Sequence, residues 1–426
     1  IYQVAHVFPG ATADESVTYL DFISTAPKTD EFIAAANKQI AFLENVVRDE
    51  DYATGLKIQR TVKTGAKKVL HFGRNEGGAQ YVHGWLDALL VTARSNIRYL
   101  TGFTGTAGMV VITTEDMVLV TDGRYTEQAA DQLSASGAPS RLEITSTAQR
   151  DVVASVTGGA SRIGLEADHI SWSTQSRYAD DWFSAQQIIA TTGVIETLRR
   201  SKDTAELARM ELAAAIADTA LAERRSSLLD GLTESEFALA LDSAMRQLGA
   251  SGTSFETIVA SGPNGAKPHA RPTDRRIQDG DLVVIDFGCI VDGYCSDMTR
   301  TVAIGEVDPT CLRMLEVVTA SNQAGVAAVG PGVPASEIDA AARSVIAEAG
   351  WLDSFTHGTG HGVGLDIHEA PRVAATSADT LSPGEVVTVE PGVYLPAYGG
   401  VRMEDSVVVT PDGCRTFTHT TKSPTP

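Results

Sequence analysis

The sequence predicts an α/β protein in which a smaller α/β domain precedes a larger, pseudo-symmetric α+β domain. Two observations support this fold class. Residues 86–198 alternate apolar, β-branched stretches such as MVLVTDG with helical stretches such as Tyr125 to Leu133. From residue 199 onward, a pair of helices followed by strands occurs twice, which is the order needed by a sheet with helices packed outside it. We therefore expect domains at residues 86–198 and 199–426, preceded by an atypical segment at residues 1–85.

The predicted helices of the larger domain come in two pairs. In the first pair, a long amphipathic helix spans Thr204 to Leu229, and the next helix opens with the capping box of Thr233 and Glu236. Strands that carry acidic residues follow each pair. The second pair of helices is expected at Pro309 to Val329 and Glu337 to Ala349.

Length and composition argue for a folded protein without nucleic-acid or membrane partners. The 426 residues, 43% of them hydrophobic, are enough for two or three domains with a sizeable core. The formal net charge of −20 leaves no basic patch to replace the counterions of a nucleic acid. Hydrophobic stretches are short and interrupted by charge, so we expect no helix that spans a membrane.

Cysteine usage and the amino terminus favour a cytoplasmic protein. None of the four cysteines stands in a C-x-x-C pair, so neither a disulfide framework nor a zinc finger is expected. No signal peptide is recognisable, although a chain that begins with Ile1 need not contain the natural start. We therefore expect a bacterial-type cytoplasm.

Two aspartates are expected to share one face of a β-hairpin. The apolar stretch Asp281 to Phe287 reads as a strand, Asp292-Gly293 as the turn, and Tyr294 to Ile304 as the returning strand. Because side chains alternate between the two faces of a strand, Asp286 and Asp297 become diagonal neighbours about 7 Å apart at the backbone. Such a pair can hold a metal ion or bridge two. The alternative is a solvated edge hairpin, in which paired aspartates are common.

Three histidines cluster in the glycine-rich segment Phe355 to Pro371. His357 and His361 are four residues apart, as in a helical zinc pair, but the glycines between and after them make a helix unfavourable. A phosphate-binding glycine loop is a rival interpretation, yet no Lys-Ser or Lys-Thr follows. With His368, three of the nine histidines fall within twelve residues. This clustering favours a functional role over a set of unrelated core histidines.

Two glutamates occupy positions that are costly for an unpaired charge. Glu390 ends a strand of valine and threonine immediately before a Pro-Gly turn, and Glu404 stands inside another strand beside Asp405. A carboxylate among apolar strand residues must be paired, protonated or bound to a metal. For Glu404, a plain salt bridge to Arg402 is the alternative interpretation.

Together these segments resemble the metal site of the pita-bread metallopeptidases, the group that contains prolidase (Xaa-Pro dipeptidase), aminopeptidase P and methionine aminopeptidase. The matching stretches are IDFGCIVDGYCSDMTRT, HGTGHGVGLDIHE, VEPGVY and GVRMEDS, in family order. The resemblance covers about 340 residues from Leu86 onward. It includes a weaker signature, LDALLVTARSNIRYLTGFTGTAG, that is similar to the family's creatinase/prolidase-type amino-terminal α/β domain. It implies a pita-bread catalytic domain after that domain.

The resemblance also implies a centre of two divalent metal ions with a bridging hydroxide as nucleophile. By similarity, Asp297 and Glu404 would bridge the metals, Asp286 would close one side, and His361 with Glu390 would hold the other. Oxygen-rich ligation with one imidazole suits Mn²⁺ or Co²⁺ and tolerates Zn²⁺ or Fe²⁺, and we expect manganese.

Further residues receive catalytic or substrate-binding roles from the same resemblance. Glu390 would accept the proton of the attacking water, while His269 and His368 would steady the substrate and the tetrahedral oxyanion. His357 looks like the family's additional histidine on the substrate side. Arg402 resembles an arginine that orients ligands and substrate.

The domain before the catalytic one argues against methionine aminopeptidase, whose simple forms lack it. The expected substrates are therefore proline-containing peptides, cleaved before proline, where a tertiary amide without an N–H fits ordinary proteases poorly. The family implies a homodimer. The alternatives are a non-catalytic binding protein of the same fold and a creatinase-like hydrolase, which uses no metal. The complete ligand set argues against both.

Residues 1–85 resemble a different family. The run Asn45 to His83 is similar to the carboxy-terminal tail of the large subunit of Rieske-type aromatic-ring dioxygenases. Such enzymes need a Cys/His iron–sulfur site and a second iron site, whereas these residues contain no cysteine. We expect an inert segment from a fusion, a truncated chain or a joined gene model; the alternative is a divergent helical extension. The histidines of residues 1–85 are His6, His71 and His83.

These residues take the place of the helix with which the family's amino-terminal domain normally opens. Loss of that helix would expose apolar surface on the strand Leu86 to Thr92.

Overall fold

The computed structural model describes residues 2–9, 16–23 and 86–426, and the chain divides into two compact units. The smaller unit contains an antiparallel hairpin of β1 (Tyr2–Pro9) and β2 (Ser16–Ile23). A helical extension is therefore the wrong interpretation for these two stretches. The run Asn45 to His83 lies outside the described residues.

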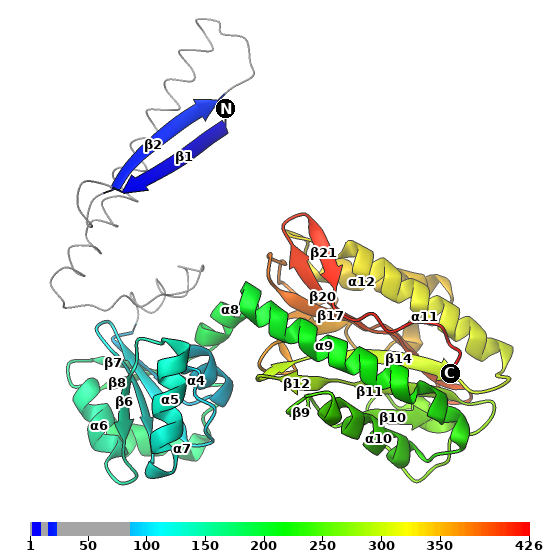
Figure 1. Ribbon diagram of the computed structural model, residues 1–426, viewed down its shortest axis with the longest axis horizontal. Helices are drawn as coiled ribbons and strands as arrows, with labels where there is room; N and C mark the ends of the chain where they lie inside the picture. Colours follow the sequence, from blue (N-terminus) through cyan, green and yellow to red (C-terminus); the bar gives the residue numbers. More distant parts are fainter. Residues whose placement is uncertain (1, 10–15, 24–85) are drawn as a thin grey trace, which may run out of the picture. The chain divides into compact units, whose positions relative to one another are not determined.

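The predicted amino-terminal α/β domain is confirmed as a six-stranded sheet in the order β6-β5-β4-β3-β7-β8 (Figure 1). β3 runs antiparallel to β4 and parallel to β7, and β7 runs parallel to β8. The strands are β3 (Ala88–Val91), β4 (Gly108–Thr113), β5 (Met117–Thr121), β6 (Arg141–Ile144), β7 (Arg162–Glu166) and β8 (Gln187–Thr191). The helices are α4 (Arg94–Thr101), α5 (Thr126–Ser136), α6 (Gln149–Val156), α7 (Trp172–Arg177) and α8 (Val194–Arg200).

The expected exposure of the strand at Leu86 to Thr92 is wrong. All four residues of β3 are buried, and Leu89 and Leu90 are each 1% exposed. The strand lies inside the sheet, where β4 and β7 pair with its backbone on both sides, and its residues Ala88 and Leu90 belong to a buried apolar cluster.

The first helix pair of the larger domain consists of α9 (Thr204–Arg224) and α10 (Glu234–Gln247). The capping box of Thr233 and Glu236 is present as predicted. α9 ends five residues before the predicted Leu229, and a 3₁₀ helix, η4 (Arg225–Asp230), follows it. The Arg225 guanidinium donates to carbonyl oxygens of the carboxy-terminal segment, at 2.9 Å for Thr425, so a long-range contact accompanies this change of helix type.

The strands after these helices form the sheets in the first half of the larger domain. α10 packs on β10 and α9 on β12, and Ala213, Phe237 and Ile285 belong to one buried apolar cluster between helices and strands. Figure 1 shows α9 and α10 covering this half from one side. The strands are β9 (Gly252–Thr253), β10 (Ile258–Ser261), β11 (Leu282–Phe287), β12 (Cys289–Val291), β13 (Tyr294–Cys295) and β14 (Met298–Ala303).

The second half repeats this order, as predicted. α11 (Pro309–Ala328) and α12 (Ala335–Glu348) cover a five-stranded sheet in the order β16-β15-β17-β20-β21, with β18 and β19 paired beside it (Figure 1). Among the described residues, no helix combines the length and the apolar character needed to cross a membrane. The strands are β15 (Gly360–Gly362), β16 (Glu369–Val373), β17 (Val386–Val389), β18 (Gly392–Leu395), β19 (Gly399–Arg402), β20 (Asp405–Thr410) and β21 (Gly413–Thr416).

Candidate metal centre

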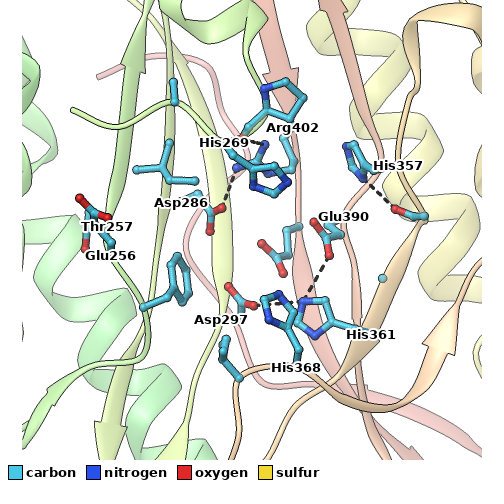
Figure 2. Close-up of a pocket in the computed structure, with 18 of the residues that line it drawn as sticks. Glu256, Thr257, His269, Asp286, Asp297, His357, His361, His368, Glu390 and Arg402 are labelled. Carbon is cyan, nitrogen blue, oxygen red and sulfur yellow. Dashed lines mark hydrogen bonds and ion pairs between the residues drawn. The ribbon is translucent and has the colours of Figure 1, made fainter. Parts of the chain in front are cut away.

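The aspartate hairpin has the predicted register. Val291 pairs with Tyr294 across the turn, and Asp292 and Gly293 adopt positive φ values of 43° and 78°, as a two-residue hairpin turn requires. The returning strand is interrupted between β13 and β14, at Ser296 and Asp297. This interruption takes Asp297 out of regular pairing, so that its side chain lies in the cavity described below (Figure 2).

The two glutamates face each other at a matching interruption in the second half. β17 pairs with β20 and β18 pairs with β19 in one continuous register, which places Glu390 opposite Glu404 at the break. Their backbone N–H groups do not donate to each other's strand. Instead, Glu390 N donates to Thr359 O at 2.7 Å and Glu404 N donates to Thr299 O at 3.1 Å. Glu404 therefore lies between β19 and β20, not inside a strand as predicted. The hydrogen bond to Thr299 ties it to the aspartate-bearing half.

His361 is positioned by a close approach of glycine backbone. A Cβ atom on Gly360 would lie 1.9 Å from Thr388 O, and one on Gly362 would lie 2.3 Å from Ala370 O. These glycines allow β15 to enter the sheet, and the helical arrangement is excluded as expected. His361 Nδ1 lies 2.9 Å from Gly362 O and so must carry its proton, which leaves the Nε2 lone pair free. That atom faces Asp297 at 3.5 Å and Glu390 at 3.4 Å.

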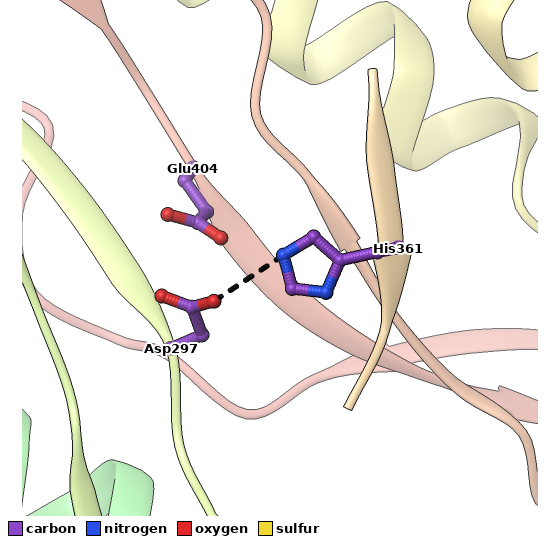
Figure 3. Close-up of side chains that lie close together, drawn as sticks. All are labelled: Asp297, His361 and Glu404. Atoms are coloured by element: carbon purple, nitrogen blue, oxygen red, sulfur yellow. Dashed lines mark ion pairs between the residues drawn. The ribbon is translucent and has the colours of Figure 1, made fainter. Parts of the chain in front are cut away.

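All nine predicted site residues line one cavity of about 610 Å³ (Figure 2). Within it, Asp297, His361 and Glu404 offer ligand atoms that all lie within 4.8 Å of one another (Figure 3). The structure thus brings together residues that are more than one hundred positions apart in the chain. The nine residues are His269, Asp286, Asp297, His357, His361, His368, Glu390, Arg402 and Glu404.

The donor set fits divalent metal ions. Asp286 Oδ1 is buried and has no hydrogen-bond partner in the part of the chain that the structure describes, although a buried carboxylate oxygen normally has one. Burial, and then repulsion by neighbouring carboxylates, raises the pKa of Asp297 and of Glu404 well above the usual value. The same causes raise the pKa of Glu390 to about 8. Cations would relieve this repulsion and supply the partner that Asp286 lacks.

The raised pKa values predict a pH-dependent stability that metal reverses. Because carboxyl groups with a raised pKa bind protons more tightly in the folded state, metal-free protein should lose stability as the pH rises from about 5 to about 8. Bound metals replace those protons, so metal-loaded protein should lack this decline. Thermal unfolding with and without metal at several pH values tests this. Glu390→Gln should make the metal-free decline shallower, because Asp297 and Glu404 still contribute to it. A melting temperature that rises over the same range would contradict the prediction.

Arg402 is paired with Asp286, not with Glu404 as the salt-bridge alternative supposed. Its Nη2 donates to Asp286 Oδ2 at 2.6 Å, and its Nη1 donates to Tyr394 Oη at 2.9 Å. Tyr394 Oη in turn lies 2.9 Å from His357 Nε2. Burial lowers the pKa of His357 to about 4, so this imidazole is neutral and accepts the tyrosine proton. A directed chain of hydrogen bonds therefore runs from the arginine to the histidine.

Sequence reasoning missed two residues that hold this site. Tyr394 stands in the VEPGVY stretch, but only the pairing of β18 with β19 brings its hydroxyl to Arg402. Glu234, fully buried at the start of α10, accepts hydrogen bonds from Ser261, Asn264 and Thr273. Those contacts organise the loop that carries His269. In the sequence, Glu234 stands between the capping-box residues Thr233 and Glu236. An acidic residue at this place is common at helix starts, so it did not indicate a role in the site.

His368 lies beside the metal-site histidine. The ring centroids of His361 and His368 are 4.4 Å apart with an interplanar angle of 64°. Burial lowers the pKa of His368, so its imidazole is neutral near pH 7 and keeps one N–H donor. His269 lines the opposite part of the cavity in Figure 2, and Arg402 donates to the carbonyl of the preceding Pro268 at 3.1 Å. Both histidines can therefore face a substrate in the cavity.

Comparison with known families matches three parts of the chain. Residues 208–411 match the model of metallopeptidase family M24, and residues 82–201 match that of the creatinase/prolidase N-terminal domain. Residues 1–92 match the model of the ring hydroxylating alpha subunit, catalytic domain, in agreement with the Rieske-type resemblance.

This chain aligns with nearly the whole length of several individual relatives. An uncharacterized peptidase of Bacillus subtilis is 40% identical over 79% of this chain and 95% of its own. The Xaa-Pro dipeptidase of Pyrococcus furiosus is 32% identical over 79% of this chain and 94% of its own. The solved Xaa-Pro dipeptidase from Bacillus anthracis superimposes with a TM-score of 0.78 at 36% identity, covering 82% of this chain and 99% of its own. The chain therefore belongs to metallopeptidase family M24, with a pita-bread catalytic domain preceded by a creatinase/prolidase-type domain.

Proposed function

We propose that this enzyme hydrolyses the peptide bond before proline in a metal-dependent reaction. The observation that carries the proposal is the convergence of four carboxylates and one imidazole in a single cavity, beside neutral histidines suited to bind a peptide. Relatives named Xaa-Pro dipeptidase support the choice of substrate.

Two divalent metal ions would be held by the five residues of the centre. Asp297 and Glu404 are the bridging candidates, since they come from opposite halves and Glu404 is hydrogen-bonded to Thr299, two residues after Asp297. Asp286 would complete one side and His361 with Glu390 the other. The bound ions would acidify a water molecule and polarise the scissile carbonyl. One imidazole among carboxylates favours manganese, and Co²⁺, Zn²⁺ or Fe²⁺ are compatible with the same donors.

The remaining residues would handle the substrate and the protons. Glu390 is our candidate acceptor for the proton of the attacking water, because its carboxylate lines the cavity next to His361. His269 and His368 would donate hydrogen bonds to the substrate and to the developing oxyanion. Arg402 would act indirectly, since its guanidinium donates to Pro268, Tyr394 and Asp286. His357 would contact the substrate.

Neither alternative function is favoured by the site. A non-catalytic binding protein of this fold, or a creatinase-like hydrolase, would not need four buried carboxylates around one imidazole. Such a cluster costs stability in the absence of cations. The retained ligands therefore support a metal-dependent hydrolase.

Other features of the proposal rest on the family resemblance and on sequence. We assign residues 86–198 to the amino-terminal domain, residues 199–426 to the catalytic domain, and residues 1–85 to a catalytically inert segment. We also propose a homodimer in the cytoplasm, without nucleic-acid or membrane partners. Analytical ultracentrifugation of the full chain tests the dimer.

Peptide hydrolysis assays test the function directly. Full-length protein loaded with Mn²⁺ should cleave Xaa-Pro dipeptides or longer Xaa-Pro-Xaa peptides, and chelation should reduce the rate by at least about 10³-fold. Matched Xaa-Ala peptides are the control for proline preference. Comparing dipeptides with longer peptides assigns the enzyme as a dipeptidase or an aminopeptidase. Metal-loaded protein that cleaves neither class of proline peptide would contradict the proposal.

A further inference from the structure

We propose that Arg199, in α8 at the boundary between the two domains, is a positioning residue that holds the loop Val363 to His368 and so sets the place of His368 in the cavity. The inference rests on the proposed function for its kinetic part. It starts from a buried cation that does not itself line the cavity, whereas one of its partners, Glu369, does.

Arg199 is 3% exposed at the end of α8 and has partners in both domains. Its Nη2 donates to Asp366 Oδ2 at 2.8 Å and also to Glu369 Oε1. Its Nη1 donates to Asn96 Oδ1 at 2.8 Å. One guanidinium thus joins the amino-terminal domain to two carboxylates that flank His368 in the sequence.

The amino-terminal side of this connection is rigidly held. The Asn96 amide donates to Glu166 Oε1 and to Glu196 Oε1, each at 2.7 Å. Glu166 also accepts the backbone N–H of Ala93 at 2.8 Å, where β3 leads into α4. A second link runs from Ser95 Oγ to Asp366. The ends of β3 and β7 therefore fix the position of the arginine.

The catalytic side of the connection is the loop itself. Glu369 Oε1 accepts the backbone N–H of Asp366 at 3.0 Å, and Oε2 accepts from Lys202 Nζ at 3.2 Å. This closes a short turn in which His368 is one of two intervening residues. Glu369 also lines the cavity. A Cβ atom on Gly364 would lie 2.6 Å from Glu369 Oε2, so the loop folds tightly over this carboxylate.

Removing the guanidinium should therefore release the loop. Glu369, whose side chain is 8% exposed, would keep Lys202 as its cationic partner, and Asp366 would lose its salt bridge. Misplacement of a catalytic group by about 1 Å can cost about 10²-fold in rate. The metal ligands are held by separate hydrogen bonds, so metal binding should persist.

The chain offers a matched control in the next residue. Arg200 also forms two ion pairs, with Asp379 and Glu385 at 2.8 Å each, and its side chain is 22% exposed. Neither partner lines the cavity. Arg200→Gln should destabilise the fold in the same way as Arg199→Gln without moving His368.

The test compares Arg199→Gln, Arg199→Lys and Arg200→Gln in full-length, metal-loaded protein. We expect Arg199→Gln to lower kcat by about 10- to 100-fold with bound metal unchanged, Arg199→Lys to restore part of it, and Arg200→Gln to keep kcat. Deuterium exchange in a peptide covering residues 363–369 should rise for Arg199→Gln alone. In a His368→Ala background, Arg199→Gln should have no further effect on kcat, because the two residues act as one unit.

The proposal is overturned if Arg199→Gln and Arg200→Gln lose equal activity, or if Arg199→Gln is equally harmful with and without His368. Should Arg199→Gln fail to fold, Ser95→Ala removes a single link to Asp366 and must show the same changes to a smaller extent. An absence of Xaa-Pro hydrolysis by unmodified protein would refute the proposed function alone. Deuterium exchange would then still decide whether Arg199 holds the loop.

Discussion

Replacing Glu404 by glutamine is expected to lower Xaa-Pro hydrolysis by about 10³-fold or more, together with a loss of bound metal. The amide has the same size as the carboxylate but supplies no negative charge. Glu404 is 2% exposed and accepts a hydrogen bond from Thr299 Oγ1 at 2.7 Å, so the fold around it should survive. Metal analysis of the purified variant and peptide hydrolysis with added Mn²⁺ measure the two effects.

Asp379→Asn is the control for this substitution. Asp379 is also a carboxylate in an ion pair, with Arg200 at 2.8 Å, but it does not line the cavity. The Asp379→Asn variant should retain full metal content and activity. A Glu404→Gln variant that keeps both would show that the buried carboxylates serve another purpose.

Replacing His368 by alanine is expected to lower kcat by about 10²-fold while the metal content stays unchanged. The side chain lies against His361 but does not belong to the cluster of ligand atoms formed by Asp297, His361 and Glu404. Its neutral imidazole can donate one hydrogen bond to a substrate oxygen, and that bond matters most when negative charge develops there. Steady-state kinetics with an Xaa-Pro dipeptide and metal analysis separate the two roles.

His419→Ala provides the comparison, because His419 is exposed and does not line the cavity. It should leave kcat unchanged. If His368→Ala released metal from the protein, His368 would have to be reassigned as a ligand. An unchanged kcat would remove it from the reaction.

Local pattern predicted the elements and most of the site because the deciding interactions are short in sequence. The turn at Asp292 and Gly293 fixes the register of its own hairpin, and this register alone put Asp286 and Asp297 on one face. Similarly, glycines on either side of His361 excluded a helix without knowledge of the partner strands.

Long-range pairing explains where these predictions were wrong. Glu404 was placed inside a strand, and Arg402 was offered as its partner, because the two are neighbours in the sequence. The structure instead interrupts the strand at Glu404 and pairs Arg402 with Asp286 from the other half at 2.6 Å. Periodicity within one strand contains no information about such a partner.

The sequence by itself determined the α/β class, the repeated order of helices and strands, and the residue types of a metal centre, since periodicity, turns and caps are local. Only the tertiary structure decided which of these residues touch. It built the Arg402–Tyr394–His357 chain, buried Glu234 under the His269 loop, and linked Arg199 to the loop of His368. The physical reason is that a buried charge takes its partner from whichever segment packs against it, and packing joins segments that are far apart in the chain.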